Sequence, residues 1–264
     1  MTCLYVYCVV RSSVEREPEL EEALSVGGGG QPVHLVAAGG LGAVVSRIDQ
    51  PEVETTRANL IAHERVLERV MATLPLLPVR FGTVTPSGDG PEIVRGLLAD
   101  RSEEFDGLLR DVEHRVELGV KALWADEEAV FTEIAAGAPA VRTLRDRMLS
   151  HPSRVGQIER VRLGRVVKEA LERRRAALAH RILAPLRAIA TRVVENPILL
   201  DRMIVNAAFL VERERDAEFD CRVRELDGEL APAVSLRYVG PVPPYNFVQV
   251  TVDWGQAVGR ARWA

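Results

Sequence analysis

Several residue patterns that define common classes of protein are missing from this sequence. The three cysteines, Cys3, Cys8 and Cys221, are odd in number and have no C-x-x-C spacing. They therefore indicate neither a disulfide framework nor a zinc site, and we expect no metal. No apolar run approaches the roughly 18 residues that can span a bilayer, and the first ten residues lack a basic region and a small-residue cleavage site. We therefore expect a cytoplasmic protein that does not enter a membrane.

Lysine is nearly absent as well. Lys121 and Lys168 are the only lysines among the 34 lysines and arginines, which indicates either a codon bias or a use of arginine for pairing and stacking. The net charge of -4 argues against a nucleic-acid-binding protein, because such proteins normally carry a basic face. The 264 residues, 47% of them hydrophobic, are enough for two domains with apolar cores.

The first part of the chain predicts strands separated by helices. Residues 4–10 (LYVYCVV) are β-branched and aromatic, which favours a buried central strand. Residues 15–24 have helical spacing. Residues 33–38 and 41–46 are short apolar segments separated by Gly39-Gly40, a pattern typical of a β-hairpin.

A second helix and a fourth strand complete this domain. Residues 54–74 carry an apolar stripe at helical spacing, and the proline-containing segment 74–84 predicts a strand. Arg80 lies between two hydrophobic residues there, so we expect it to be buried against a carboxylate or a carbonyl group. The order βαββαβ predicts a ferredoxin-like domain over residues 1–112 within an α+β fold.

The remaining chain predicts a second α+β domain over residues 113–264. A helix from Pro91 would cover the first sheet or join the two domains. A half-exposed strand over 114–124 would open the second domain, and a helical arm would fill most of 126–195. The other elements that we expect there are strands at 207–211 and 234–239, a helix at 218–230, and a proline-rich segment at 240–247 without regular structure.

Few residues suggest chemistry. His63 stands beside Glu64 and could be a base or a ligand, but no H-E-x-x-H or G-x-S-x-G pattern is present, so a helix-surface or hydrogen-bonded packing histidine is favoured. Tyr245, Asn246 and Phe247 form a proline-flanked aromatic run. It could be an adhesive edge for a partner, or it could close the core of the second domain.

Seven short motifs together resemble the gas vesicle protein F/L family. They occur in the same order along nearly the whole chain, so their combination is more specific than any one of them. They are YVY at Tyr5–Tyr7, AVVS at Ala43–Ser46, HERVLE at His63–Glu68, LPVRFGT at Leu77–Thr83, VKALW at Val120–Trp124, AFLV at Ala208–Val211 and GPVPPYNFV at Gly240–Val248. One departure is Val242, which stands where the family typically has tryptophan.

The resemblance implies two α+β domains, no catalysis, no cofactor and a minor structural or assembly role in gas vesicles, the hollow protein shells that make cells buoyant. The implied partners are the hydrophobic major shell protein and other gas vesicle accessory proteins. The candidate structural or partner-binding residues are His63, Arg80, Phe81, Tyr245, Asn246 and Phe247. The alternative is a ferredoxin-like protein or enzyme that binds a cofactor or a small ligand on its open sheet face.

Overall fold

The computed structural model describes residues 3–12, 25–28, 30–137, 139–150, 156–248, 250–252 and 254. The chain divides into two compact units, Met1–Glu117 with Pro241–Ala264, and Leu118–Gly240. This division differs from the expected one in two ways. The boundary follows Glu117 instead of residue 112, and the C-terminal segment belongs to the first unit instead of the second. The physical reason is that Val248 and Val250 are buried in an apolar core of that unit.

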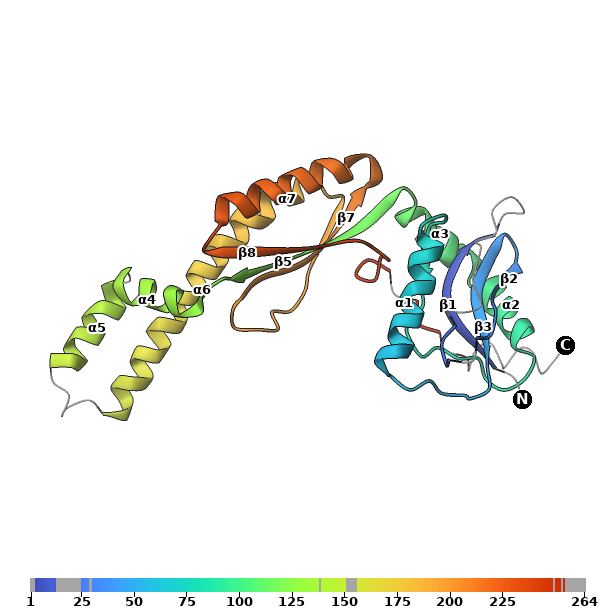
Figure 1. Cartoon of the computed structure of the whole chain (residues 1–264), viewed down its shortest axis with the longest axis horizontal. Coiled ribbons are helices and arrows are strands. Elements are labelled where there is room, and N and C mark those ends of the chain that lie inside the picture. The colour runs from blue at the N-terminus through green and yellow to red at the C-terminus, as the bar shows by residue number, and fades with distance from the viewer. Residues whose placement is uncertain are drawn as a thin grey trace. The chain divides into compact units, whose positions relative to one another are not determined.

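The first unit contains an antiparallel sheet of β1 (Cys3–Arg11), β2 (Val33–Ala38), β3 (Leu41–Ile48) and β4 (Leu76–Pro78) (Figure 1). Its strand order is β2-β3-β1-β4, in which β3 lies between β1 and β2 as in a split βαβ arrangement. β1 is central and buried, as predicted. The helix expected at 15–24 lies outside the described residues.

The β2–β3 connection is the predicted hairpin. Gly39 and Gly40 have φ of 59° and 83°, the two positive values that a two-residue type I′ turn requires. A side chain at either position would be strained, so the glycine pair sets the register that aligns β2 with β3.

Both faces of this sheet are covered. The helix α1 (Arg57–Met71) packs on one face, and α2 (Gly90–Asp100) and α3 (Ser102–Val112) pack on the other (Figure 1). The register of β1 against β3 shifts between Val6 and Cys8, so Tyr7 and Cys8 both join the core under α1. Tyr5 and Tyr7 share the face beneath α1 by the normal two-residue alternation of the strand, and the shift adds Cys8 and Val10 to that face.

The helix expected to start at Pro91 is two helices. α2 starts after the N-cap Asp89, whose side chain accepts a hydrogen bond from the N–H of Glu92, and it ends at Asp100. Arg101 leaves helical geometry with ψ of 22° and binds Glu104 of α3. The two helices carry their apolar residues into one core, so the prediction that this region covers the sheet is correct.

The second unit also has a sheet with helices. Its strands are β5 (Arg115–Trp124), β6 (Arg192–Glu195), β7 (Met203–Glu212) and β8 (Val234–Val242), in the order β6-β7-β5-β8. The start of β5 and the end of β8 lie in the segments assigned to the first unit. Its helices are α4 (Glu127–Gly137), α5 (Pro139–Ser150), α6 (Gln157–Arg187) and α7 (Asp216–Leu230), with a 3-10 turn at Arg213–Arg215. When the strands are numbered along the chain within each unit, both sheets have the same spatial order, 2-3-1-4.

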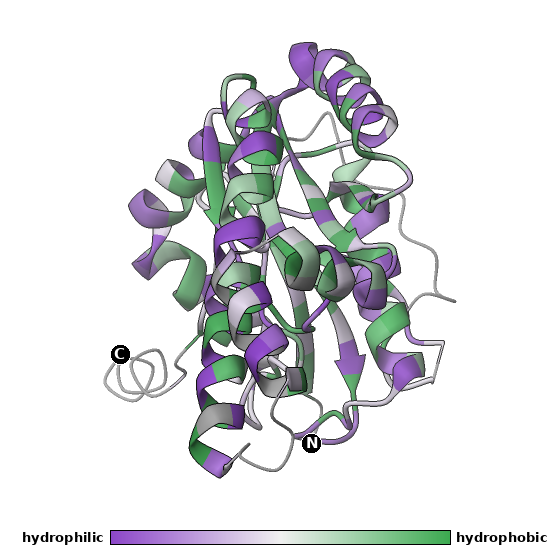
Figure 2. Ribbon diagram, turned by 90° about the vertical axis from the view of Figure 1, so that its left-hand side faces the viewer, coloured by the Kyte–Doolittle hydropathy of each residue, from purple (hydrophilic) through white to green (hydrophobic). Residues whose placement is uncertain are grey.

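Three expectations for this region need correction. The segment 240–247 was expected to lack regular structure, but β8 continues as far as Val242. β5 is mostly buried instead of half-exposed, and even Glu117 is only 2% exposed. The helical arm ends at Arg187 rather than near Glu195, because β6 begins at Arg192 and pairs antiparallel with β7. Hydrophobic and hydrophilic residues alternate along the helices (Figure 2), and no helix within the described ranges is long and apolar enough to cross a membrane.

Candidate functional site

α1 places His63 inside the protein. The helix is capped by Thr56, whose hydroxyl accepts a hydrogen bond from the N–H of Asn59. Its buried residues follow a helical stripe and are His63, Val66, Leu67 and Val70. His63 is 3% exposed, so it is a packing histidine in the core.

Two tyrosines of β1 surround this imidazole. The His63 ring stacks on Tyr7 with centroids 5.7 Å apart, and it meets the edge of Tyr5 at 5.8 Å. The Tyr5 hydroxyl lies 2.9 Å from Nδ1 of His63, and the Tyr7 hydroxyl lies 2.9 Å from Oγ of Ser46. Burial lowers the pKa of His63 to about 4, so the imidazole is neutral at physiological pH.

The hydrogen bonds of Tyr5 favour one tautomer of His63. Burial raises the pKa of the Tyr5 phenol, so the group keeps its proton. Its oxygen accepts a hydrogen bond from the N–H of Gly82 at 3.1 Å, and its proton is then donated to Nδ1 of His63. With the phenol proton donated to Nδ1, we assign the neutral imidazole the tautomer that carries its own proton on Nε2.

The segment after β4 turns where a continuous strand was expected. The N–H and the hydroxyl of Thr83 both donate to the carbonyl oxygen of Arg80, at 3.2 and 2.7 Å. Gly82 has φ of 84°, which is typical of the third residue of a type II turn. After the turn, Val84 pairs with Tyr5, so the chain rejoins the edge of β1. The R-F-G-T sequence was the signal for this turn.

The turn brings Arg80 and Phe81 to the surface. Arg80 is exposed, so the prediction of a buried arginine is wrong. Its side chain makes no hydrogen bond or salt bridge with any residue that the structure describes. Phe81 is half-buried and packs its ring against Tyr5 and His63, with centroids 6.1 and 5.6 Å apart.

The C-terminal motif is fastened to the first unit. The Tyr245 hydroxyl donates to the carboxylate of Glu64 on α1 at 2.8 Å, and Phe247 is 8% exposed. This excludes the expectation that the run closes the core of the second domain. Burial raises the pKa of Glu64, while the bond from Tyr245 opposes that shift.

Glu117 is an acceptor that sequence reasoning missed. Its carboxylate accepts the main-chain N–H of Asn246 at 2.9 Å and the side-chain Nδ2 of the same residue at 2.6 Å. Burial raises the pKa of Glu117, and the two bonds from Asn246 oppose this. No local pattern marks this pair, because the partners are 129 positions apart.

Three separate motifs meet around one pocket of about 450 Å³. α1 contributes His63 and Glu64 from the HERVLE motif, and Leu60 from the preceding turn of the helix. The other walls come from LPVRFGT, at Pro78, Val79, Arg80 and Phe81, and from the C-terminal segment, at Tyr245, Val248, Val250 and Thr251. Four of the six candidate residues thus line the pocket, while Asn246 and Phe247 belong to the segment that forms one wall.

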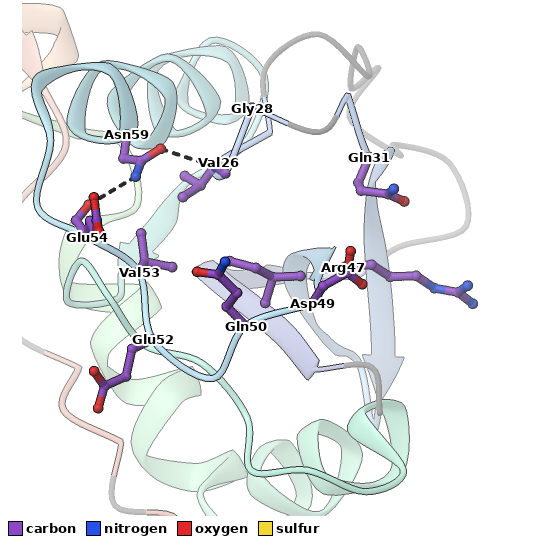
Figure 3. Close-up of a pocket in the computed structure, with 12 residues that line it drawn as sticks. Val26, Gly28, Gln31, Arg47, Asp49, Gln50, Glu52, Val53, Glu54 and Asn59 are labelled. Carbon is purple, nitrogen blue, oxygen red and sulfur yellow. Dashed lines mark hydrogen bonds between the residues drawn. The ribbon is translucent and has the colours of Figure 1, made fainter.

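A second pocket lies elsewhere in the first unit (Figure 3). Its volume is about 480 Å³, and its walls include Gly28, Arg47, Asp49 and Asn59. Both polar atoms of the Asn59 side chain are already hydrogen-bonded within the protein: its oxygen accepts from the N–H of Gly27, and its Nδ2 donates to the carbonyl of Glu54. None of the six candidate residues lines this pocket.

The motif-lined pocket combines apolar walls with a few polar groups. Within the described part of the chain, no three His, Cys, Asp or Glu side chains are grouped so as to hold a metal ion. The chemistry that its walls offer is contact with an apolar group and donation of hydrogen bonds from Arg80 and His63.

The fold and this pocket define a two-unit α+β protein whose most specific motifs converge on one surface site. The chain belongs to the Gas vesicle synthesis protein GvpL/GvpF family, whose family model matches residues 3–249. It is 36% identical to gas vesicle protein F of Streptomyces sp. (strain CB03234), over 93% of this chain and 99% of that protein. Gas vesicle protein L of the same strain is 30% identical, over 94% of each chain.

Two crystal structures share the fold. Gas vesicle protein GvpF from Anabaena sp. PCC7120 superposes with a TM-score of 0.83 at 26% identity, over 96% of this chain and 100% of that chain. GvpF from Microcystis aeruginosa gives a TM-score of 0.78 at 25% identity, over 94% and 99% of the two chains. The expected family and the α+β class are therefore confirmed, and the protein has an accessory role in gas vesicles.

Proposed function

We propose that this protein is a non-enzymatic assembly factor or minor component that binds the hydrophobic major shell protein while gas vesicles form in the cytoplasm. The observation that supports this most is the convergence of three family motifs on one apolar-walled pocket in the first unit. Leu60 lines that pocket and is 40% exposed, as is its neighbour Ile61 on α1. Together they offer apolar surface to a partner.

The physical task would be to cover apolar surface before polymerisation. A small and very hydrophobic shell subunit exposes such surface until it is built into the shell, and exposed apolar surface drives aggregation. A partner that binds this surface reversibly would keep the subunit available. The other gas vesicle accessory proteins are further candidate partners.

Binding can be tested with the purified protein and the major shell protein of the same organism. We expect a complex on co-purification and less light scattering from the shell protein. Leu60→Asp combined with Ile61→Asp should weaken the complex, whereas Phe131→Asp, at a 45% exposed aromatic of α4, is the matched control. A strain that lacks the protein should make few or no vesicles, and normal vesicles there would contradict the proposal.

Cofactor or small-ligand binding is the competing function. The absorbance spectrum of the purified protein separates the two, because a bound haem or flavin absorbs visible light. A stoichiometric chromophore that is lost in His63→Ala would favour the competing function over shell-protein binding.

A further inference from the structure

Arg80 stands at the wall of an apolar pocket, and its side chain has no partner among the residues that the structure describes. Its guanidinium has no hydrogen bond or salt bridge among the described residues, although its carbonyl is held by two bonds from Thr83. Some arginines of the unit are paired, such as Arg11 with Asp106 and Glu113, and Arg80 differs from them because it stands at a pocket wall. A guanidinium presents a fork of donors that matches a carboxylate, so Arg80 is positioned to receive an acceptor from outside the chain.

His63 supplies a second donor to the same pocket. The residue is 3% exposed, its Nδ1 is bonded to Tyr5, and its Nε2 has no partner within the described part of the chain. Nδ1 is bonded to Tyr5, which does not line the pocket, so we assign Nε2 to the contact of His63 with the pocket. Nε2 is not among the buried side-chain atoms that lack a partner, so solvent reaches it and an acceptor in the pocket would replace water there.

The remaining walls select among anions. Phe81, Val79 and Val248 are hydrophobic, and Glu64, the one carboxylate among the described lining residues, already accepts from Tyr245. A doubly charged phosphate would meet one cation and this nearby carboxylate, which is a poor balance of charge. A carboxylate carried on an aliphatic chain satisfies the two donors and fills the apolar volume.

We propose that this pocket receives an acidic side chain flanked by aliphatic residues on the partner protein, with Arg80 and Nε2 of His63 as its hydrogen-bond donors. The inference rests on the proposed function, because the partner segment would belong to the major shell protein. The acidic side chain then anchors an otherwise apolar contact and fixes its register, as charged groups do at protein interfaces.

The first experiment measures affinity for the major shell protein. Arg80→Gln should weaken binding about tenfold, as expected for loss of a charge-assisted pair, and Arg80→Lys should recover part of it. Arg65→Gln removes the same charge from an exposed position of α1 outside the pocket and should change affinity less than about twofold. Equal affinity of wild type and Arg80→Gln would overturn the inference while leaving shell-protein binding intact.

A photo-cross-linking residue at Phe81 identifies the partner segment. The captured peptide should contain an aspartate or glutamate next to aliphatic residues. Changing that acid to its amide in the shell protein should weaken its binding to the wild type about tenfold, and its binding to the Arg80→Gln variant less than about twofold. If the losses of affinity from Arg80→Gln and from the acid-to-amide change multiply when both are present, the inference is overturned. Capture of a second copy of this chain would overturn it as well.

A small probe tests the pocket independently of the shell protein. Hexanoate should shift the Nε2 resonance of ¹⁵N-labelled His63 with millimolar affinity, whereas hexanamide and the Arg80→Gln variant should give at least fivefold weaker effects. If wild type fails to bind the shell protein, the proposed function is wrong, and a shift by hexanoate alone would still support a carboxylate pocket. Absence of the shift would overturn that pocket chemistry. Micromolar affinity for hexanoate would overturn the assignment to a protein segment and indicate a small-molecule site.

Discussion

The hydroxyl of Tyr5 and Nδ1 of His63 lie 2.9 Å apart in a buried hydrogen bond that joins β1 to α1. The same hydroxyl accepts the N–H of Gly82, so one phenol connects the central strand, the covering helix and the turn that carries Arg80. The position of the pocket wall thus depends on this hydroxyl.

Tyr5→Phe should destabilise the first unit by roughly 1–3 kcal/mol, because it leaves Nδ1 of His63 and the N–H of Gly82 without their partner. Hydrogen exchange of the β1 amides, followed by mass spectrometry, reports the stability of this unit alone. The loss should be smaller when Tyr5→Phe is made in a His63→Leu background, and equal losses in both backgrounds would contradict the coupling.

His63 should make stability depend on pH. Its pKa is about 4 in the folded protein, against about 6.5 in an unfolded chain, so the unfolded state binds the extra proton between these values. The free energy of unfolding therefore falls as the pH drops from 6.5 to 4, by at most about 1.4 kcal/mol per pH unit.

The measurement for this pH effect is a comparison with His63→Leu. Glu64 and Glu117 have raised pKa values, so their protonation favours the folded state as the pH falls and opposes the effect of His63. The difference between wild type and variant removes their contribution. A difference that stays constant from pH 7 to pH 4 would contradict a buried neutral histidine.

Alanine substitutions at Gly82 and Gly96 should change the free energy of unfolding in opposite directions. Gly82→Ala should cost about 1–2 kcal/mol because φ is 84°, although no atom lies within 4 Å of the added Cβ. Gly96 lies inside α2 and is equally open, so Gly96→Ala should stabilise by roughly 0.5–1 kcal/mol. Thermal unfolding compares them, and a stabilising Gly82→Ala would exclude the turn described here.

Asn246→Ala should loosen the C-terminal segment. It removes the side-chain donor to the buried carboxylate of Glu117, at a cost of about 1.5–3 kcal/mol. In a Glu117→Gln background the same change should cost about 1 kcal/mol or less, because the acceptor is then neutral. Hydrogen exchange in the peptide that contains Phe247 is the direct measurement.

Local features of the fold were predictable from the sequence. The β-branched run of β1, the Gly39-Gly40 hairpin and the apolar stripe of α1 each depend on neighbouring residues, and the structure agrees with all three. The turn at Arg80 was missed because apolar residues on both sides of it favoured a strand. The positive φ of Gly82 gives the physical reason for the turn.

The assembly of the pocket was not predictable from local patterns. Tyr245 and Glu64 are 181 positions apart, and Asn246 and Glu117 are 129 apart. A single sequence does not say which carboxylate a distant donor meets. The motif resemblance identified the segments, but only the fold brings them together.

The first unit is discontinuous along the chain, since it ends at Glu117 and resumes at Pro241. All of Leu118–Gly240 is therefore synthesised before the residues that cover the core at Val248 and Val250. The core of the first unit is completed only after the whole second unit has been made. The pocket needs the residues from Tyr245 to Thr251, so a nascent chain that has not yet reached them would not capture its partner there.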